Sequence, residues 1–198
     1  VLIDGPEADA FAATATSVLS DIGAQTMLTD GMAAAYRSGR NRVAATMGVQ
    51  DLLTTSCDGR TATPFLYRTD GDAWLSEDAL GEEVFGPLGL IVTVKDEEQM
   101  RIVAQSLKGQ LTCTIHMDRD DTDLARGLLP TLERKAGRIL CNGFPTGVEV
   151  SDTMVHGGPY PASTNFGATS VGTMSIRRWL RPVCFQNLPD DILPSDVA

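Results

Sequence analysis

The stretch Glu82-Glu83-Val84-Phe85-Gly86-Pro87 runs directly into the apolar segment Leu88–Val94. Two adjacent carboxylates and an aromatic ring therefore precede a Gly-Pro turn and a strand that is apolar enough to be buried. Gly86 permits tight backbone geometry, and Pro87 fixes its own φ and disfavours a helical conformation at Gly86. Such a turn holds the preceding side chains at a strand end, where α/β proteins often place ligand contacts. An acidic loop followed by a hydrophobic anchor is the alternative.

Downstream of this stretch the pattern alternates between strand and helix. The expected order is a strand at Leu90–Val94, a helix with the stripe Met100, Val103, Ala104 and Leu107, a strand at Leu111–Met117, a helix with the stripe Leu124, Leu128 and Leu132, and a strand at Arg138–Cys141. Asp96 is placed to cap the first helix, and Glu97 can pair with Arg101 one turn later. Pro130 is expected to kink or break the second helix. Strands and helices in this order predict an α/β layer architecture.

Upstream of the stretch, two amphipathic helices are expected. The first covers Glu7–Ile22 with the stripe Phe11, Ala15, Val18 and Ile22, and the second follows a cap at Asp30 with the stripe Met32, Tyr36, Val43 and Met47. Helical spacing of apolar residues supports both. Val1–Ile3 resembles the tail of a strand, as though the chain were cut inside a larger fold. Short strands are expected at Leu52–Thr55 and Pro64–Arg68, and a helical turn at Trp74–Leu80.

The last third of the chain has a different composition. Residues Asn142–Gly167 are dense in Gly, Pro, Ser, Thr and Asn, which is typical of a functional loop or of a floppy insertion. Thr169 or Ser170 can cap a last helix that ends at Trp179. Pro182–Phe185 can form an edge strand, which tends to add to another sheet.

Composition excludes several classes of protein. The 198 residues are 42% hydrophobic and 21% charged, which is typical of one ordinary globular domain. The net charge of −10 argues against nucleic acid or an anionic membrane as a partner. No apolar run approaches the roughly 20 residues of a membrane span. The four cysteines form no CxxC pair, so disulfides and metal clusters are poorly supported and a reducing cytoplasm is the expected location.

The motifs together resemble the aldehyde dehydrogenase superfamily. Glu82–Pro87 is similar to the Glu-x-Phe-Gly-Pro signature of that family, and it is followed by Gly137–Asn142, by Gly157-Gly158 and by a basic, Trp-containing final segment. Asn142–Val150 and His156–Pro161 resemble the branch of NADP-preferring enzymes that act on 2-oxoglutarate semialdehyde (2,5-dioxopentanoate) and related fatty aldehydes. The resemblance implies a catalytic-domain-like sheet with helices on both faces in residues 1–180. It also implies an oligomerisation tail with a C-terminal strand in residues 181–198, and a homo-oligomer.

The resemblance also implies roles for particular residues. Glu83 would bind the ribose hydroxyls of NADP or NAD, and Phe85 would lie against the nicotinamide ring, while Glu82 would face solvent. The pocket for a small aldehyde would include Asn142, Phe144, Thr146 and His156. His156 stands where many family members have a Phe, which favours a polar aldehyde.

No catalytic residue is expected within this chain. In the family, a cysteine thiolate attacks the aldehyde and a glutamate activates the water that releases the product. The motifs that carry these two groups, and the glycine-rich phosphate-binding segment, are not found here. The cysteines Cys113, Cys141 and Cys184 lie in apolar strand contexts, and Cys57 lies in a polar turn, so none resembles an activated nucleophile.

Other readings of the sequence remain open. Four aspartates between Asp118 and Asp123, beside His116, can suggest a divalent metal, but helix capping explains the same acids. The Ser163–Asn165 run can form an anion nest. For the chain as a whole, the alternatives are a non-catalytic assembly or regulatory module with a dehydrogenase-derived fold, and an unrelated α/β ligand-binding domain.

Overall fold

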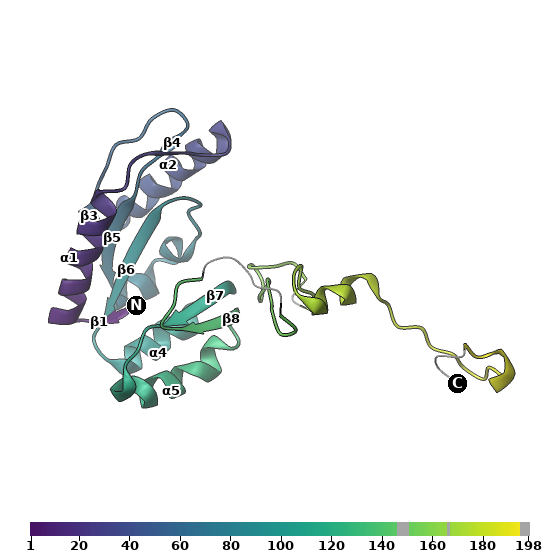
Figure 1. The fold of residues 1–198 in the computed structure, drawn as a ribbon. Helices are drawn as coiled ribbons and strands as arrows, with labels where there is room; N and C mark the ends of the chain where they lie inside the picture. Colours follow the sequence, from purple (N-terminus) through teal and green to yellow (C-terminus); the bar gives the residue numbers. More distant parts are fainter. Residues whose placement is uncertain (146–150, 166, 195–198) are drawn as a thin grey trace.

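The computed structural model describes residues 1–145, 151–165 and 167–194, and it is shown in Figure 1. The strands are β1 (Leu2–Ile3), β2 (Gln25–Thr26), β3 (Gln50–Leu53), β4 (Thr61–Ala62), β5 (Phe65–Asp70), β6 (Leu88–Val94), β7 (Gln110–Ile115) and β8 (Ala136–Cys141). The α-helices are α1 (Pro6–Ser20), α2 (Asp30–Ala44), α3 (Gly71–Ser76), α4 (Glu97–Ser106) and α5 (Thr122–Leu132). The 3₁₀ helices are η1 (Asp78–Gly81), η2 (Arg119–Asp121), η3 (Thr173–Trp179) and η4 (Asp190–Ile192).

The predicted strand β6 lies inside a four-stranded sheet with the order β1-β6-β5-β3. β5 runs parallel to β6 along its whole length, from Phe65 opposite Leu88 to Asp70 opposite Thr93. β1 is also parallel to β6, whereas β3 is antiparallel to β5. The sheet is therefore mixed, with its antiparallel strand at one edge.

Helices cover both faces of this sheet, as expected. Along β5 the side chains alternate between the faces, because successive residues of a strand point in opposite directions. Leu66 packs with Ala12 of α1, while Phe65 and Tyr67 pack with Tyr36 of α2. The two resulting hydrophobic clusters form the core of the larger lobe, which is the four-stranded sheet together with α1 and α2.

The predicted face of α1 is correct for Ala15, which packs against the core, and wrong for its other members. The buried residues are Ala8 and Ala12, and Ala15 and Leu19 pack beside them. Phe11 and Val18 of the predicted stripe are 52% and 61% exposed, and Ile22 lies beyond the end of the helix. Small alanines let the helix approach the sheet closely, and an alanine-rich helix presents helical spacing on more than one face.

A second unit consists of β7 and β8, which are parallel, with α4 and α5 against one face. Ala104, Leu128 and Leu132 form its small core, with Cys113 and Ile139 packed against it. Among the described residues this pair is separate from the four-stranded sheet, so the alternating elements do not form one continuous sheet. Pro130 lies inside α5, which continues to Leu132, so it does not break the helix.

The predicted capping residue is confirmed for α4 and is wrong for α2. Asp96 accepts a hydrogen bond from the backbone N–H of Gln99 at 2.8 Å, and Arg101 pairs with Glu97 at 3.1 Å, as predicted. The cap of α2 is Thr29, whose Oγ1 accepts from the N–H of Met32 at 3.1 Å, so Asp30 is the first helical residue. An acid in the first turn still favours the helix through its dipole.

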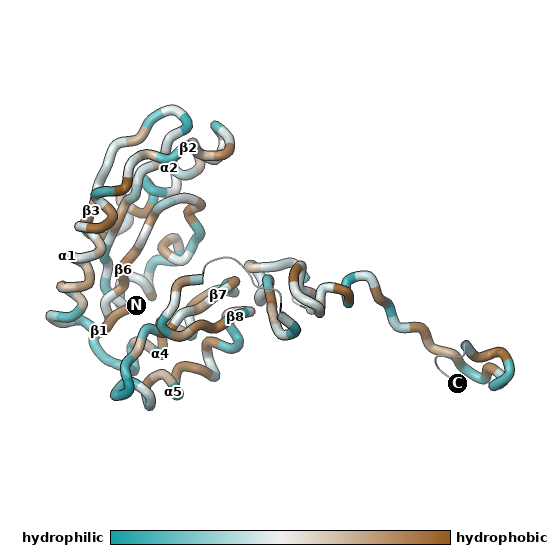
Figure 2. The backbone as a smooth tube through the Cα atoms, in the orientation of Figure 1, coloured by the Kyte–Doolittle hydropathy of each residue, from teal (hydrophilic) through white to brown (hydrophobic). Residues whose placement is uncertain are grey.

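The C-terminal part from residue 167 onward extends away from both units as an arm (Figure 1). The helix predicted to end at Trp179 is a 3₁₀ helix whose N-cap is Gly172, not Thr169 or Ser170. Figure 2 shows apolar positions recurring along this arm, and Trp179 and Leu180 are 84% and 67% exposed. Because these side chains bury little area, nothing within the described chain supports a longer helix. Pro182–Phe185 pairs with no described strand.

No helix among the described residues is both long enough and apolar enough to span a membrane.

Candidate functional site

The loop Glu82–Pro87 is seated on helix α2 by alternate residues. Val84 packs against Gly39, where an added Cβ would lie 2.9 Å from a Val84 methyl group. Glu82 is exposed, as expected, and it also pairs with Arg42 at 3.3 Å. An added Cβ at Gly86 would lie 2.3 Å from the Tyr36 ring, and Gly86 has a φ of +152°, so only glycine fits this position.

Tyr36 links this loop to the sheet. Its ring is fully buried, and its hydroxyl donates to the carbonyl oxygen of Thr63 at 2.8 Å and lies 3.2 Å from that of Pro87. Burial raises the pKa of Tyr36 to about 12, so the hydroxyl stays protonated and remains a donor at neutral pH. The Pro87 carbonyl also accepts from the N–H of Phe65 at 2.9 Å, which fixes the loop where β5 and β6 begin.

Glu83 and Phe85 are left pointing away from α2. Because Glu82, Val84 and Gly86 contact the helix, the two residues between them lie on the opposite side of the loop. Glu83 is exposed and has no hydrogen-bond or ion-pair partner among the residues that the structure describes. Phe85 is 64% exposed, which is unusual for an aromatic side chain beside a buried strand. Both predicted cofactor contacts are therefore accessible to a ligand.

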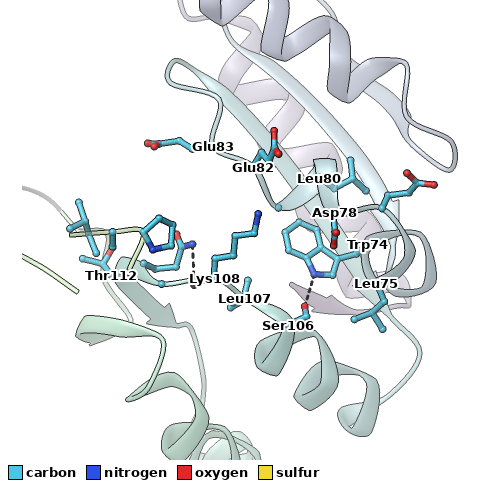
Figure 3. Close-up of a pocket in the computed structure, with 17 residues that line it drawn as sticks. Trp74, Leu75, Asp78, Leu80, Glu82, Glu83, Ser106, Leu107, Lys108 and Thr112 are labelled. Atoms are coloured by element: carbon cyan, nitrogen blue, oxygen red, sulfur yellow. Dashed lines mark hydrogen bonds between the residues drawn. The ribbon is translucent and has the colours of Figure 1, made fainter. Parts of the chain in front are cut away.

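A cleft of about 690 Å³ opens beside Glu83. One wall is formed by residues between Trp74 and Glu83, and the other by residues between Ser106 and Thr112 (Figure 3). The indole N–H of Trp74 donates to Ser106 Oγ at 3.0 Å and ties the two walls together. Pro161 and Ala162 complete the lining.

His156 lies on a loop that reaches the same cleft. The glycines after it approach the β7–β8 pair closely: an added Cβ at Gly158 would lie 2.2 Å from the carbonyl oxygen of Gln110, and one at Gly137 would lie 2.0 Å from that of Gly157. The backbone N–H of His156 donates to Thr169 Oγ1 at 2.9 Å, and its side chain is exposed. The loop is thus fixed through its backbone while the imidazole remains available.

Asn142 and Phe144 lie at the other end of β7 and β8. The side-chain amide of Asn142 bonds to both backbone groups of Met117, accepting from its N–H at 2.8 Å and donating to its carbonyl at 2.9 Å. Phe144 is exposed and its ring centroid lies 5.2 Å from that of His116. At about 3.3 Å per residue, the length of β7 separates this group from the His156 loop by roughly 15–20 Å.

The four predicted pocket residues therefore do not form one described cluster. His156 lies on the loop beside the cleft, Asn142 and Phe144 lie at the far strand ends, and Thr146 falls outside the described residues. Sequence reasoning missed His116 as the neighbour of Phe144, and missed Tyr36, Gly39 and Arg42 as the support of the Glu82–Pro87 loop. A glycine inside a helix, as at Gly39, was the one available indication of a close contact.

The cysteines occupy three kinds of surroundings. Cys57 and Cys113 are half-buried, and burial raises the pKa of the Cys113 thiol. The expectation of burial is wrong for Cys141 and Cys184, which are exposed because one ends strand β8 and the other lies on the arm. Among the described residues, no group of His, Cys, Asp and Glu is arranged to hold a metal ion.

Sequence comparison identifies close relatives of the chain. It is 51% identical over 197 residues to alpha-ketoglutaric semialdehyde dehydrogenase 2 of Azospirillum brasilense, a match that covers 97% of this chain and 37% of the relative. It is 41% identical over 195 residues to alpha-ketoglutaric semialdehyde dehydrogenase of Acinetobacter baylyi. That match also covers 97% of this chain and 37% of the relative. The chain thus spans little more than a third of the length of these curated relatives. No family model matches it.

Solved structures show the same fold at lower sequence identity. The betaine aldehyde dehydrogenase of Staphylococcus aureus, solved with NAD+, superposes with a TM-score of 0.68 at 16% identity and covers 90% of this chain and 37% of its own. The NADP-dependent glyceraldehyde-3-phosphate dehydrogenase of Bacillus halodurans, solved with NADP, gives a TM-score of 0.64 at 20% identity. The match covers 80% of this chain and 33% of the dehydrogenase.

The α/β fold and these matches place the chain in the aldehyde dehydrogenase superfamily. Within that superfamily its sequence is similar, over nearly its whole length, to the alpha-ketoglutaric semialdehyde dehydrogenases. An unrelated α/β ligand-binding domain is thereby excluded.

Proposed function

We propose that these 198 residues are the carboxy-terminal part of an NAD(P)-dependent aldehyde dehydrogenase that oxidises a small aldehyde, such as 2-oxoglutarate semialdehyde, to the carboxylate. The observation that carries this proposal is the loop Glu82–Pro87. It is fixed to α2 by alternate residues and leaves Glu83 and Phe85 exposed, with Glu83 lining a cleft. The 51% identity to a curated alpha-ketoglutaric semialdehyde dehydrogenase supports the choice of aldehyde.

The chemistry of Glu83 and Phe85 fits the nicotinamide end of NADP or NAD. A carboxylate without a protein partner can accept two hydrogen bonds from the vicinal hydroxyls of a ribose. The exposed ring of Phe85 offers a flat apolar surface to an aromatic ring. The bound cofactor supplies the oxidising capacity of the reaction, and these two side chains orient it. Whether NADP or NAD is preferred depends on recognition of the adenine ribose, for which this chain offers no described group.

The substrate contacts of this chain come from the loop that carries His156. Its imidazole is exposed, and it can donate or accept a hydrogen bond. We assign Asn142 a structural part in the pocket wall, because its amide is already bonded to Met117. The family resemblance assigns Phe144 and Thr146 to the pocket as well. Phe144 lies at the opposite strand ends from the His156 loop, and Thr146 falls outside the described residues.

The arm is the proposed site of assembly. We propose that residues 1–180 form part of the catalytic domain and that residues 181–198 are an oligomerisation tail in a cytoplasmic homo-oligomer. Exposed apolar side chains along the arm, among them Trp179 and Val183, support an arm that is covered by a partner. A second candidate function is a non-catalytic assembly module, which the exposed arm would serve equally well.

The proposal is tested by the substitution Glu83→Gln in the whole polypeptide that carries these residues. Loss of the carboxylate weakens a charged hydrogen bond worth about 1–3 kcal/mol. The KM for the cofactor is expected to rise, and the oxidation step to become rate-limiting while aldehyde capture is little affected. Steady-state kinetics with 2-oxoglutarate semialdehyde, with NADP and with NAD, measure both effects.

Glu97→Gln is a suitable control, because Glu97 lies on α4 and, among the described residues, its ion-pair partner is Arg101 at the surface. An unchanged KM and kcat in Glu83→Gln would mean that Glu83 only faces solvent. Absence of any aldehyde oxidation by the wild-type polypeptide would favour the non-catalytic assembly module.

A further inference from the structure

We propose that Gly39 of α2 is a positioning residue that sets the height of Glu83 and Phe85 above the helix. This inference rests on the proposed cofactor role of the Glu82–Pro87 loop. It adds a residue that contacts no ligand and lies more than forty positions earlier in the sequence.

The contact between Gly39 and Val84 leaves no spare room. Gly39 is buried in the middle of α2, and an added Cβ would lie 2.9 Å and 3.0 Å from the two methyl groups of Val84. Heavy atoms of apolar groups normally stay about 3.5–4.0 Å apart. A methyl group at position 39 therefore has to push Val84 outward by several tenths of an ångström.

The helix is better fixed than the loop, so the loop is the part that moves. α2 is anchored in the core by Tyr36 and Val43, which are 0% and 2% exposed. The loop is held by the half-buried Val84, by the Tyr36 ring against Gly86 and by the surface ion pair of Glu82 with Arg42. An exposed ion pair contributes little to holding the loop. The packing of Val84 on Gly39 therefore sets the distance of Glu83 and Phe85 from α2.

Glu83 and Phe85 are the immediate neighbours of Val84 on the chain. A displacement of Val84 therefore moves both residues together, away from the geometry that a bound cofactor requires. Glycine in a helix interior is otherwise unfavourable compared with alanine. Its presence at position 39 is explained by the space that Val84 needs.

The test is the substitution Gly39→Ala in the whole polypeptide, with the dissociation constant for NADPH measured by fluorescence titration. We expect the constant to rise at least about fivefold, which is a fraction of what a lost charged hydrogen bond would give. Alanine is the better helix former, so the melting temperature is expected to stay equal or to rise. The double variant Gly39→Ala/Val84→Ala removes the two methyl groups that clash, and it is expected to recover most of the affinity.

Gly31→Ala is the matched control, because it makes the same change in the same helix where the nearest atom, Thr29 Oγ1, is 3.8 Å from the added Cβ. Its dissociation constant is expected to equal that of the wild type. The inference is overturned if Glu83→Gln weakens NADPH binding while Gly39→Ala does not. It is also overturned if Gly39→Ala lowers the melting temperature markedly, or if the double variant stays as weak as the single one. A wild-type polypeptide that binds neither NADPH nor NADH would instead overturn the proposed function itself.

Discussion

At the scale of single residues, the Glu82–Pro87 loop shows how alternation sorts neighbouring side chains into different roles. Glu82 and Val84 contact α2, and Gly86 lies against Tyr36. Glu83 and Phe85 lie between them and face outward. The two adjacent glutamates therefore differ in what they contact, because one pairs with Arg42 and the other has no described partner. A shift of one residue in the loop would exchange these roles.

His156 is the residue at which the choice of substrate can be tested. Its backbone is fixed by Thr169 while its side chain is free to contact a ligand. Replacing it by Phe in the whole polypeptide removes a hydrogen-bonding group and adds apolar area, worth about 1–3 kcal/mol in discrimination. The ratio of kcat/KM for 2-oxoglutarate semialdehyde over hexanal is expected to fall at least roughly tenfold.

Tyr160→Phe is a useful companion to His156→Phe, because Tyr160 is 78% exposed on the same loop and its ring is retained. The ratio should be unaffected in that variant. If His156→Phe also leaves the ratio unchanged within error, His156 does not line the pocket, and the preference for a polar aldehyde loses its support in this chain.

At the scale of elements, the loop that carries His156 depends on contacts between glycines and backbone carbonyls. Gly137→Ala would place a Cβ 2.0 Å from the carbonyl oxygen of Gly157, so that either the loop or strand β8 must move. Overpacking of this kind costs typically about 1–3 kcal/mol. The melting temperature is therefore expected to fall. Thermal unfolding of the whole polypeptide measures it, and limited proteolysis shows whether the loop has detached.

Gly127→Ala serves as the comparison for Gly137→Ala. The added Cβ in α5 would meet only the end of the Arg101 side chain at 3.5 Å, and alanine favours the helix. Its melting temperature should be equal or higher. An equal melting temperature for Gly137→Ala, with an unchanged proteolysis pattern, would show that the loop is not seated as described.

Elements with a strong local pattern were predictable from the sequence, and contacts between distant segments were not. β6 and α4 follow from an apolar run and from the cap at Asp96, which are local features. The face of α1 was mistaken because alanine contributes little to hydrophobic contrast. For the site, Glu83 and Phe85 were recognisable from a motif. Their support by Gly39 and Tyr36 was not, since it depends on how two distant segments pack.

At the scale of the whole molecule, the described structure consists of a mixed sheet between helices, a separate parallel pair and an arm that leaves both. The sheet β1-β6-β5-β3 and the pair β7-β8 share no strand pairing among the described residues. The cleft beside Glu83 lies between the region of α3 and η1 on one side and the end of α4 with the start of β7 on the other. Aldehyde dehydrogenases of known structure share this fold over up to 91% of the chain while being more than twice as long.

The 198-residue chain, tested by itself, is expected to show no aldehyde oxidation with NAD or NADP. None of its four cysteines stands in the nucleophile motif that the family resemblance implies, although Cys57 Sγ accepts a hydrogen bond from the Arg40 guanidinium at 3.6 Å. Cys113 is half-buried with a raised pKa, which disfavours the thiolate that would attack an aldehyde. Exposed Cys141 ends a strand at the far end of β8 from the Glu83 cleft, and Cys57 packs against the core of the larger lobe.

Purified chain incubated with short semialdehydes should therefore stay at the rate without enzyme, while the whole polypeptide turns over under the same conditions. Both proteins would be compared at equal concentration by the absorbance of the reduced cofactor. Turnover by the chain that disappears in Cys57→Ala or Cys141→Ala would contradict this expectation. It would place a nucleophile within the 198 residues, and the cleft beside Glu83 would then have to hold the aldehyde as well as the cofactor.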